Sequence, residues 1–179
     1  MIKMIISGGQ TGVDRSALDV ALKLDINYGG WCPKGRIDEN GIIPPIYSKL
    51  KEVEGTFENE QANYSMRTIN NIRDSDGTLI LVPEIPLSKS INDGTILTMK
   101  EVKARSKPSL LVGLNENHEK NILLIKDWII SNKIEILNVA GPRESNSPGV
   151  YQASVKLLRE TIHSLQNENR SSSKIKSRI

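Results

Sequence analysis

The sequence has one cysteine, two histidines and no long apolar run. A single cysteine excludes a disulfide within the chain and any thiolate-rich zinc or iron–sulfur site built by one copy. No segment approaches the roughly 20 apolar residues of a membrane span, and the N-terminus has no apolar stretch long enough for a signal peptide. We therefore expect a soluble, cytoplasmic protein in a reducing compartment, with no membrane partner.

Excess charge of one sign is also missing, because 24 Lys and Arg face 21 Asp and Glu. Much of the small surplus lies in the polar stretch 170–178, so a broad basic face for nucleic acid is not expected. The 179 residues suit one domain, which we place at 1–166. We expect the basic tail, 167–179, to be disordered because it lacks apolar periodicity.

The apolar pattern predicts an α/β fold, a single Rossmann-like three-layer domain with a mainly parallel sheet of about five to seven strands. The segments 78–82 and 109–113 are continuously apolar, as in strands covered on both faces, and we expect both in the sheet centre. The long segment from Gly29 to about Gly55 is expected to be a loop that is either functional or disordered. Strands are predicted at 2–6, 26–28, 78–82, 109–113 and 135–139, and helices at 13–24, 58–73, 94–105, 118–131 and 148–166.

The first strand runs into a glycine-rich junction and then into an amphipathic helix. Glycines at 8, 9 and 12 let a ligand approach the backbone, and the first amides after Thr11 lack acceptors within the helix. We expect these amides to face outward and to bind an anion, most simply phosphate. Thr11 and Asp14 also have the spacing of a capping box, so a turn that only begins a helix is the alternative.

Two further junctions are predicted at the carboxyl ends of strands, where α/β sheets bind ligands. Asp93-Gly94-Thr95 places free amides and a hydroxyl at a helix start, or is simply an Asp cap followed by glycine. Arg143 follows Gly141-Pro142 and could hold an oxyanion through two hydrogen bonds. Its alternative is an ion pair with Glu144 or Asp14.

Several familiar sites are excluded by what the junctions lack. The first loop has no Lys-Ser or Lys-Thr after its glycines, so it is not the phosphate loop of ATPases and GTPases. It also lacks Gly-x-Gly-x-x-Gly spacing, and Tyr28-Gly29-Gly30 stands where a dinucleotide-binding domain has a carboxylate for ribose. No Ser-His-Asp or Cys-His arrangement can be assembled from the spacing.

The remaining polar residues have ordinary interpretations beside functional ones. Asp74 and Asp76 could bind a hard cation, but two carboxylates before a strand more often cap and turn the chain. Cys32 is expected to be a small buried side chain, the alternative being a soft metal ligand. His118 and His163 are expected to face solvent, and Arg67 and Arg73, about two helical turns apart, could face the cleft.

Together these motifs resemble the molybdenum carrier, or molybdenum cofactor carrier, proteins, a branch of the SLOG superfamily of Rossmann-like nucleotide-ligand binders. The resemblance covers about residues 4–158 and implies an oligomeric Rossmann-like domain that binds molybdenum cofactor, a pterin phosphate carrying an oxo-molybdenum dithiolene. Asp93 stands where the resemblance leads us to expect glycine. The matching stretches are Ile6–Arg15, Gly29–Arg36, Asn71–Leu81, Leu137–Ser145 and Pro148–Tyr151.

The resemblance implies a carrier rather than an enzyme, with no catalytic residues and no resident metal. On this hypothesis the two glycine junctions hold the phosphate, Arg143 with Lys34 or Arg36 adds positive charge, and Trp31 packs against the pterin. The expected partners are a small phosphorylated ligand, copies of the chain in a dimer or tetramer, and recipient molybdoenzymes. The residues expected at the site are Gly8, Gly9, Gln10, Thr11, Gly12, Asp14, Arg15, Trp31, Lys34, Gly94, Thr95, Gly141, Arg143 and Ser145.

Two alternatives come from other functional classes. A nucleotide N-glycosidase or phosphoribohydrolase of the same superfamily would carry a glutamate just after its Gly-Thr, and here Thr98 stands near that place. Glu101 lies about one helical turn further along, which leaves the hydrolase weakened but open. A nucleotide-ligand sensor is the third hypothesis, although no effector segment is recognisable in the sequence.

Overall fold

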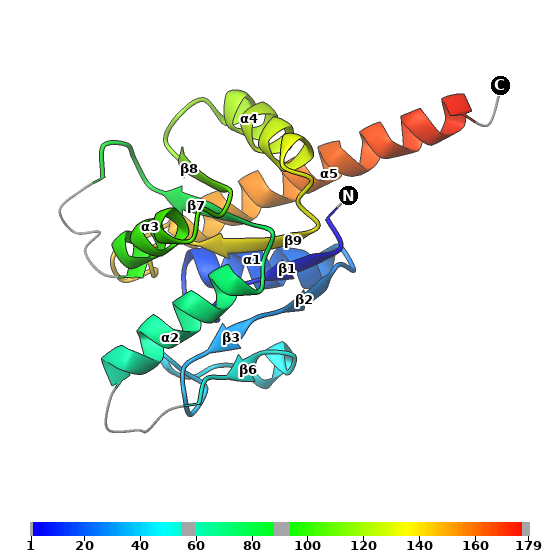
Figure 1. The fold of residues 1–179 in the computed structure, drawn as a ribbon. Helices are drawn as coiled ribbons and strands as arrows, with labels where there is room; N and C mark the ends of the chain where they lie inside the picture. The colour runs from blue at the N-terminus through cyan, green and yellow to red at the C-terminus, as the bar shows by residue number, and fades with distance from the viewer. Residues whose placement is uncertain (1, 55–59, 88–93, 177–179) are drawn as a thin grey trace.

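The computed structural model describes residues 2–54, 60–87 and 94–176 and has one central parallel sheet (Figure 1). Its strand order is β2-β1-β9-β7-β8, so a strand from the end of the chain lies between the first strand and the middle ones. The five strands are β1 (Met4–Ile6), β2 (Asn27–Gly29), β7 (Gly77–Val82), β8 (Ser109–Gly113) and β9 (Ile136–Ala140).

Helices cover both faces of this sheet. Helix α5 packs against α1 and α4, whereas α2 packs against α3, which gives the two outer layers of a three-layer domain (Figure 1). The side chains of β7 divide between these layers, since Leu79 and Leu81 belong to the larger core and Ile80 and Val82 pack with α2 and α3 residues. The helices are α1 (Val13–Lys23), α2 (Glu60–Arg73), α3 (Gly94–Ala104), α4 (His118–Ser131) and α5 (Val150–Lys176).

The predicted fold class is confirmed, and the five helices and five strands lie close to their expected ranges. Helix α4 has its predicted bounds because the Asn117 side chain accepts a hydrogen bond from the Lys120 amide at 2.9 Å and fixes the helix start. The expected position of the apolar segment 109–113 is wrong: β8 is an edge strand of the sheet. Helices on both faces make an edge strand apolar too, so composition alone did not distinguish it from a central one.

The segment between β2 and α2 contains regular structure that the sequence pattern did not reveal. It forms β3 (Trp31–Cys32) paired with β6 (Lys51–Glu52), a hairpin of β4 (Ile37–Asp38) and β5 (Gly41–Ile42), and a 3₁₀ turn, η1 (Pro45–Tyr47). Two-residue strands are too short to show a period of two.

Helix α5 ends at Lys176, ten residues beyond the predicted boundary at 166, and its last part extends away from the sheet (Figure 1). The helical backbone thus continues into the expected tail, and the disorder of 167–179 stays a prediction. Of the helices in the described ranges, none combines the length and apolar character needed to cross a membrane.

Candidate functional site

Two adjoining hollows lie near the ends of β1 and β9, beside α2 and the start of α3. The first is formed by the loop after β1, helices α1 and α2, the start of α3 and the end of β9. The second shares Arg67, Thr68 and Gly94 with the first and adds Tyr64, Ser65, Leu97 and Arg143. The residues of the first hollow are Gly8, Asp14, Arg67, Thr68, Asn71, Gly94, Thr98 and Asn138 to Gly141.

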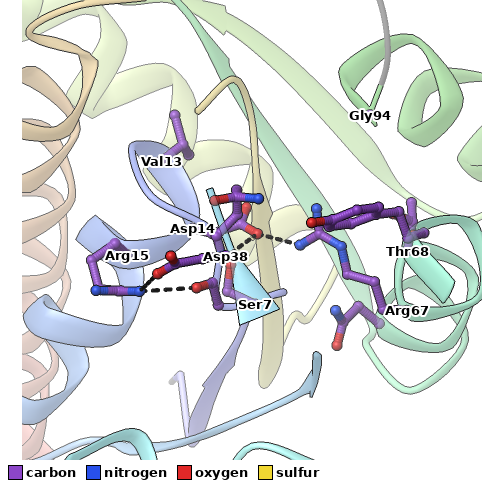
Figure 2. A network of polar contacts seen from close by, with 12 residues as sticks. Ser7, Val13, Asp14, Arg15, Asp38, Arg67, Thr68 and Gly94 are labelled. Atoms are coloured by element: carbon purple, nitrogen blue, oxygen red, sulfur yellow. Dashed lines mark hydrogen bonds and ion pairs between the residues drawn. The ribbon is translucent and has the colours of Figure 1, made fainter. Parts of the chain in front are cut away.

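A buried ion pair forms part of the first hollow. The Arg67 guanidinium lies 2.5 Å from the Asp14 carboxylate, and the two side chains are 13% and 5% exposed (Figure 2). A Cβ at Gly8 would be 1.5 Å from the Arg67 guanidinium, so glycine lets this cation lie directly over the first loop. Asp14 therefore holds an arginine inside the predicted anion site.

An aromatic ring lies beside two arginines in the second hollow. The guanidinium carbons of Arg67 and Arg143 are 5.8 and 6.0 Å from the centre of the Tyr64 ring, close enough for cation–π attraction. Tyr64 comes from α2, Arg143 from the loop after β9, and Gly94 from the start of α3. The hollow thus combines positive charge with a flat apolar surface.

The glycine loop after β1 differs from the expected open cradle, because part of it is closed by the loop after β9. The Val13 amide donates to the Pro142 carbonyl at 3.2 Å, so it does not face outward as expected. Gly12 has φ of +68°, and a Cβ there would be 2.5 Å from the Pro142 oxygen. Gly12 is the N-cap and no side chain caps it, so the Thr11 capping box is not formed.

The amide of Gln10 organises the same loop. Its oxygen accepts hydrogen bonds from the Thr11 and Glu39 amides at 3.0 and 2.9 Å. Its nitrogen is buried and has no partner among the described residues. The backbone amide of Gln10 donates to the Asp14 carboxylate at 3.3 Å, which connects the loop to the ion pair.

Glu39, which the sequence did not single out, lies between the first and last loops. Its carboxylate accepts hydrogen bonds from the hydroxyls of Thr11 and Ser145 and from the Ser145 amide at 3.3 Å, and it lies 4.0 Å from Arg143. Burial raises the pKa of Glu39, but these hydrogen bonds and Arg143 outweigh burial and lower it overall. The paired carboxylate expected for Arg143 was Glu144 or Asp14; the structure places Glu39 there.

Arg15, an expected site residue, supports the loop from behind. It donates to Asp38 at 2.7 Å (Figure 2) and to the Gly9 carbonyl at 3.1 Å. Its guanidinium also stacks over the Tyr47 ring at 4.7 Å. Gly9 itself has φ of +77°. These contacts fix the hairpin that carries Glu39 against the first loop.

Trp31 and Lys34 line neither hollow. Trp31 lies on β3. Its backbone exchanges hydrogen bonds with the Asn71 side chain of the first hollow, but its indole donates to Asp74 at 2.7 Å. Arg36 donates to the carbonyls of Tyr47 and Leu50, so its charge serves the local chain. The structure thus does not bring the expected aromatic residue and lysine to the hollows.

The start of α3 is only partly described, because Asp93 lies outside the described residues. A Cβ at Gly94 would meet no atom of the described residues within 4 Å, whereas one at Gly141 would be 2.3 Å from the Leu81 carbonyl. Glycine at 141 is therefore required by close packing against β7, which is not shown for Gly94. Thr95 is buried and lines neither hollow.

The alternative interpretations also have outcomes. Cys32 is fully buried as expected, and burial raises the pKa of its thiol. The Asp76 carboxylate accepts hydrogen bonds from the backbone amides of Glu135 and Ile136. It therefore holds the chain at the start of β9, in agreement with the structural interpretation of this residue. His118 hydrogen-bonds Glu160 at 2.7 Å and is not simply solvent-facing, whereas His163 is exposed as expected. Within the described ranges, no three His, Cys, Asp or Glu side chains group as metal ligands.

Of the expected site residues, the structure brings Gly8, Asp14, Gly94, Gly141 and Arg143 to the hollows. Gln10, Thr11 and Ser145 lie in the adjoining network around Glu39. Arg67 was noted only as a cation that could face the cleft. Tyr64 lies three residues earlier on the same helix, but nothing in the sequence relates it to Arg143.

The sheet order defines a doubly wound α/β domain. Numbered from β9, the strands read 3-2-1-4-5, the usual order of that class, in which ligands bind where the order reverses. That point lies between β9 and β7, and the first hollow includes the end of β9 and the start of α3, the helix that follows β7. The βα unit that is normally first, here β9 and α5, is last in this chain.

The chain belongs to the circularly permutated YpsA SLOG family, whose model matches residues 5–162. The strand order explains the permutation in the family's description. A similar crystal structure is that of the "Putative molybdenum carrier protein" from Syntrophus aciditrophicus, with 44% identity and a TM-score of 0.79 over 88% of this chain and 92% of that one. No curated protein matches the chain significantly.

Proposed function

We propose that this protein binds and carries a small phosphorylated cofactor, the molybdenum cofactor, in the two hollows. The observation that carries the proposal is the approach of Arg67 and Arg143 to the Tyr64 ring, in the hollow that Gly94 also lines. Guanidinium groups bind phosphate oxygens through paired hydrogen bonds, and an aromatic face suits a planar pterin. The related crystal structure is named a molybdenum carrier protein, which supports a ligand that contains molybdenum.

In this proposal Tyr64 takes the stacking role first expected for Trp31. The phosphate interacts with Arg143 and the backbone at Gly94, while Arg67 stays paired with Asp14 at the floor of the first hollow. Delivery to molybdoenzymes and a dimer or tetramer belong to the same proposal and rest on the resemblance. A cytoplasmic location belongs to it as well and rests on the sequence composition.

The hydrolase alternative is not favoured by the residues near α3. The Thr98 hydroxyl donates to the Gly94 carbonyl at 2.7 Å, and Glu101 pairs with Arg105 at 2.8 Å. Neither position presents a carboxylate to the hollows, so the group that would stabilise an oxocarbenium ion is not supplied by these two positions.

The test is purification from a host that makes molybdenum cofactor, followed by native mass spectrometry and elemental analysis. We expect pterin and molybdenum in near-stoichiometric amounts, lost in Arg143→Ala because the phosphate loses its cation. Arg159→Ala, on the exposed part of α5, is the matched control and should retain both. Protein that emerges without pterin and metal, or with an ordinary nucleotide, contradicts the proposal and directs attention to nucleotide hydrolysis.

A further inference from the structure

The Glu39 carboxylate occupies a set of donors that suits a ligand's anion. Thr11 and Ser145 each donate a hydroxyl to it, the Ser145 amide lies 3.3 Å away, and the Arg143 side chain lies 4.0 Å away. These donors come from the loops after β1 and β9, far apart in sequence and adjacent in space. Two hydroxyls, an amide and a guanidinium are the groups with which proteins bind phosphate.

The arrangement needs an explanation because it places a carboxylate where positive potential had been expected for a ligand. The Glu39 side chain is 13% exposed, and burying a charge is costly unless hydrogen bonds compensate. The donors provide that compensation without a ligand. These donors are therefore satisfied by an acceptor that belongs to the chain itself.

The position of Glu39 allows exchange with a ligand. Glu39 lies in the two-residue turn of the β4–β5 hairpin, next to the exposed Gly41 and Ile42. The hairpin backbone is fixed separately, through the Arg15–Asp38 ion pair. The carboxylate can therefore leave by rotation of its own side chain while the hairpin stays in place.

A second observation concerns Gln10, whose amide oxygen accepts from the backbone of both Thr11 and Glu39. The nitrogen of the same amide is buried and has no partner among the described residues. A buried donor without an acceptor is costly, and a phosphate oxygen beside Thr11 would supply one.

We propose that Thr11, Ser145 and Arg143 form a phosphate subsite and that Glu39 is its internal competitor, displaced when the phosphate binds. This inference rests on the proposed function, because Arg143 also lines the second hollow and so connects the subsite to it. Glu39 keeps the subsite closed to free phosphate at low concentration. A phosphate attached to a larger ligand gains the contacts of the hollows and displaces the carboxylate.

The experiment is calorimetric titration of inorganic phosphate into the purified protein and its variants. Glu39→Gln removes the negative charge with little change in shape, so we expect the Kd for phosphate to fall about ten-fold, as when a competing state held about nine-tenths of the time is removed. Glu135→Gln, in an exposed ion pair with Lys3 before β9, is the matched control and should leave the Kd unchanged. An unchanged or higher Kd in Glu39→Gln overturns the proposal.

Removal of a subsite donor gives the complementary result. Ser145→Ala alone should weaken phosphate binding, and Glu39→Gln/Ser145→Ala should lose most of the gain of Glu39→Gln. If Glu39→Gln fails to fold, Ser145→Ala alone still tests the proposal. Phosphate binding that Ser145→Ala leaves unchanged contradicts the subsite.

The two proposals can fail separately. If Glu39→Gln gains phosphate affinity but no pterin co-purifies with any variant, the subsite stands and free phosphate or another phosphate ester is the ligand. If pterin co-purifies equally with the parent protein, Glu39→Gln and Ser145→Ala, the carrier function stands and the subsite is overturned.

Discussion

At the scale of single residues, the structure uses charged side chains in pairs that the sequence does not connect. Asp14 and Arg67 are 53 positions apart in the sequence, and Glu39 and Ser145, which form a hydrogen bond, are 106 positions apart. Glycine positions were predictable because their spacing marks loops. Their partners were not, because a contact between loops depends on how strands far apart in sequence pair. The carboxylate that occupies an expected anion site could not be foreseen for the same reason.

A pH prediction follows from Asp74, which accepts hydrogen bonds from Arg73 and from the Trp31 indole at 2.7 Å. The Arg73 hydrogen bonds lower the pKa of Asp74 against the effect of burial, and Trp31 adds to the lowering. The charged Asp74 carboxylate contributes fully to stability above its unfolded-state pKa of about 3.9. This contribution is lost as pH falls through the pKa of Asp74 in the folded protein, which is lower. We therefore expect acid titration of Trp31 fluorescence to have a midpoint below about 3.9.

Trp128→Phe makes Trp31 the only fluorescent tryptophan for this titration, since the chain has two. Adding Asp74→Asn should abolish the transition while the protein remains folded. A midpoint at or above the ordinary aspartate value would show that the Arg73 and Trp31 hydrogen bonds do not favour the charged carboxylate.

At the scale of elements, helices with clear starts and continuous apolar strands were predicted within a few residues. Asn117 fixed α4, and the apolar run of β7 identified a strand buried on both faces. The hairpin with Glu39 was missed because its strands have two residues each. The site therefore depends on an element without periodicity, placed by the Arg15–Asp38 ion pair.

The start of α3 gives a prediction that separates ligand binding from stability. Gly94→Ala should leave the free energy of unfolding unchanged or raise it by up to about 1 kcal/mol, because the added methyl meets no atom of the described residues and alanine favours helix. It should nevertheless weaken cofactor retention, since the methyl enters the space beside the hollows. Thermal unfolding and native mass spectrometry of the same preparation measure the two effects.

Gly12→Ala is the contrasting variant for this test. Its Cβ would be 2.5 Å from the Pro142 carbonyl at a positive φ, so we expect a loss of about 1–3 kcal/mol in stability. If Gly94→Ala retains as much cofactor as the parent protein, the ligand does not approach the backbone at the start of α3.

At the scale of the whole molecule, alternation of strands and helices predicted the three layers but not the order of the strands. Insertion of β9 between β1 and β7 places the last loop beside the first and creates the site. Local pattern carries no signal for this order, because any parallel arrangement buries the same apolar runs. For this reason β8 was predicted to lie in the centre of the sheet, although it is an edge strand.

The strand order predicts that the chain tolerates return to the usual connectivity. A permutant that starts at Lys133, in the exposed turn between α4 and β9, would run β9-α5-β1 as consecutive parallel units. Residue 166 of α5 would join residue 2 through a glycine–serine linker of about ten residues. A right-handed crossover from β9 through α5 to β1 brings the end of α5 to the side of the sheet on which the parallel strands begin. The linker can therefore connect α5 to the start of β1.

We expect this permutant to unfold cooperatively and to lose about 2 kcal/mol or less, which lowers the thermal midpoint by roughly 4–8 °C for a domain of this size. Circular dichroism during heating measures both cooperativity and midpoint. The linear chain 1–166 with the same linker at its end is the control, and it should match the full chain because 167–179 are predicted to add little.

A permutant without a cooperative transition, beside a cooperative linear control, would mean that a chain beginning with β1 is needed for folding. Cooperative unfolding with phosphate binding retained would mean that the site depends on strand order in space and not on strand order in sequence.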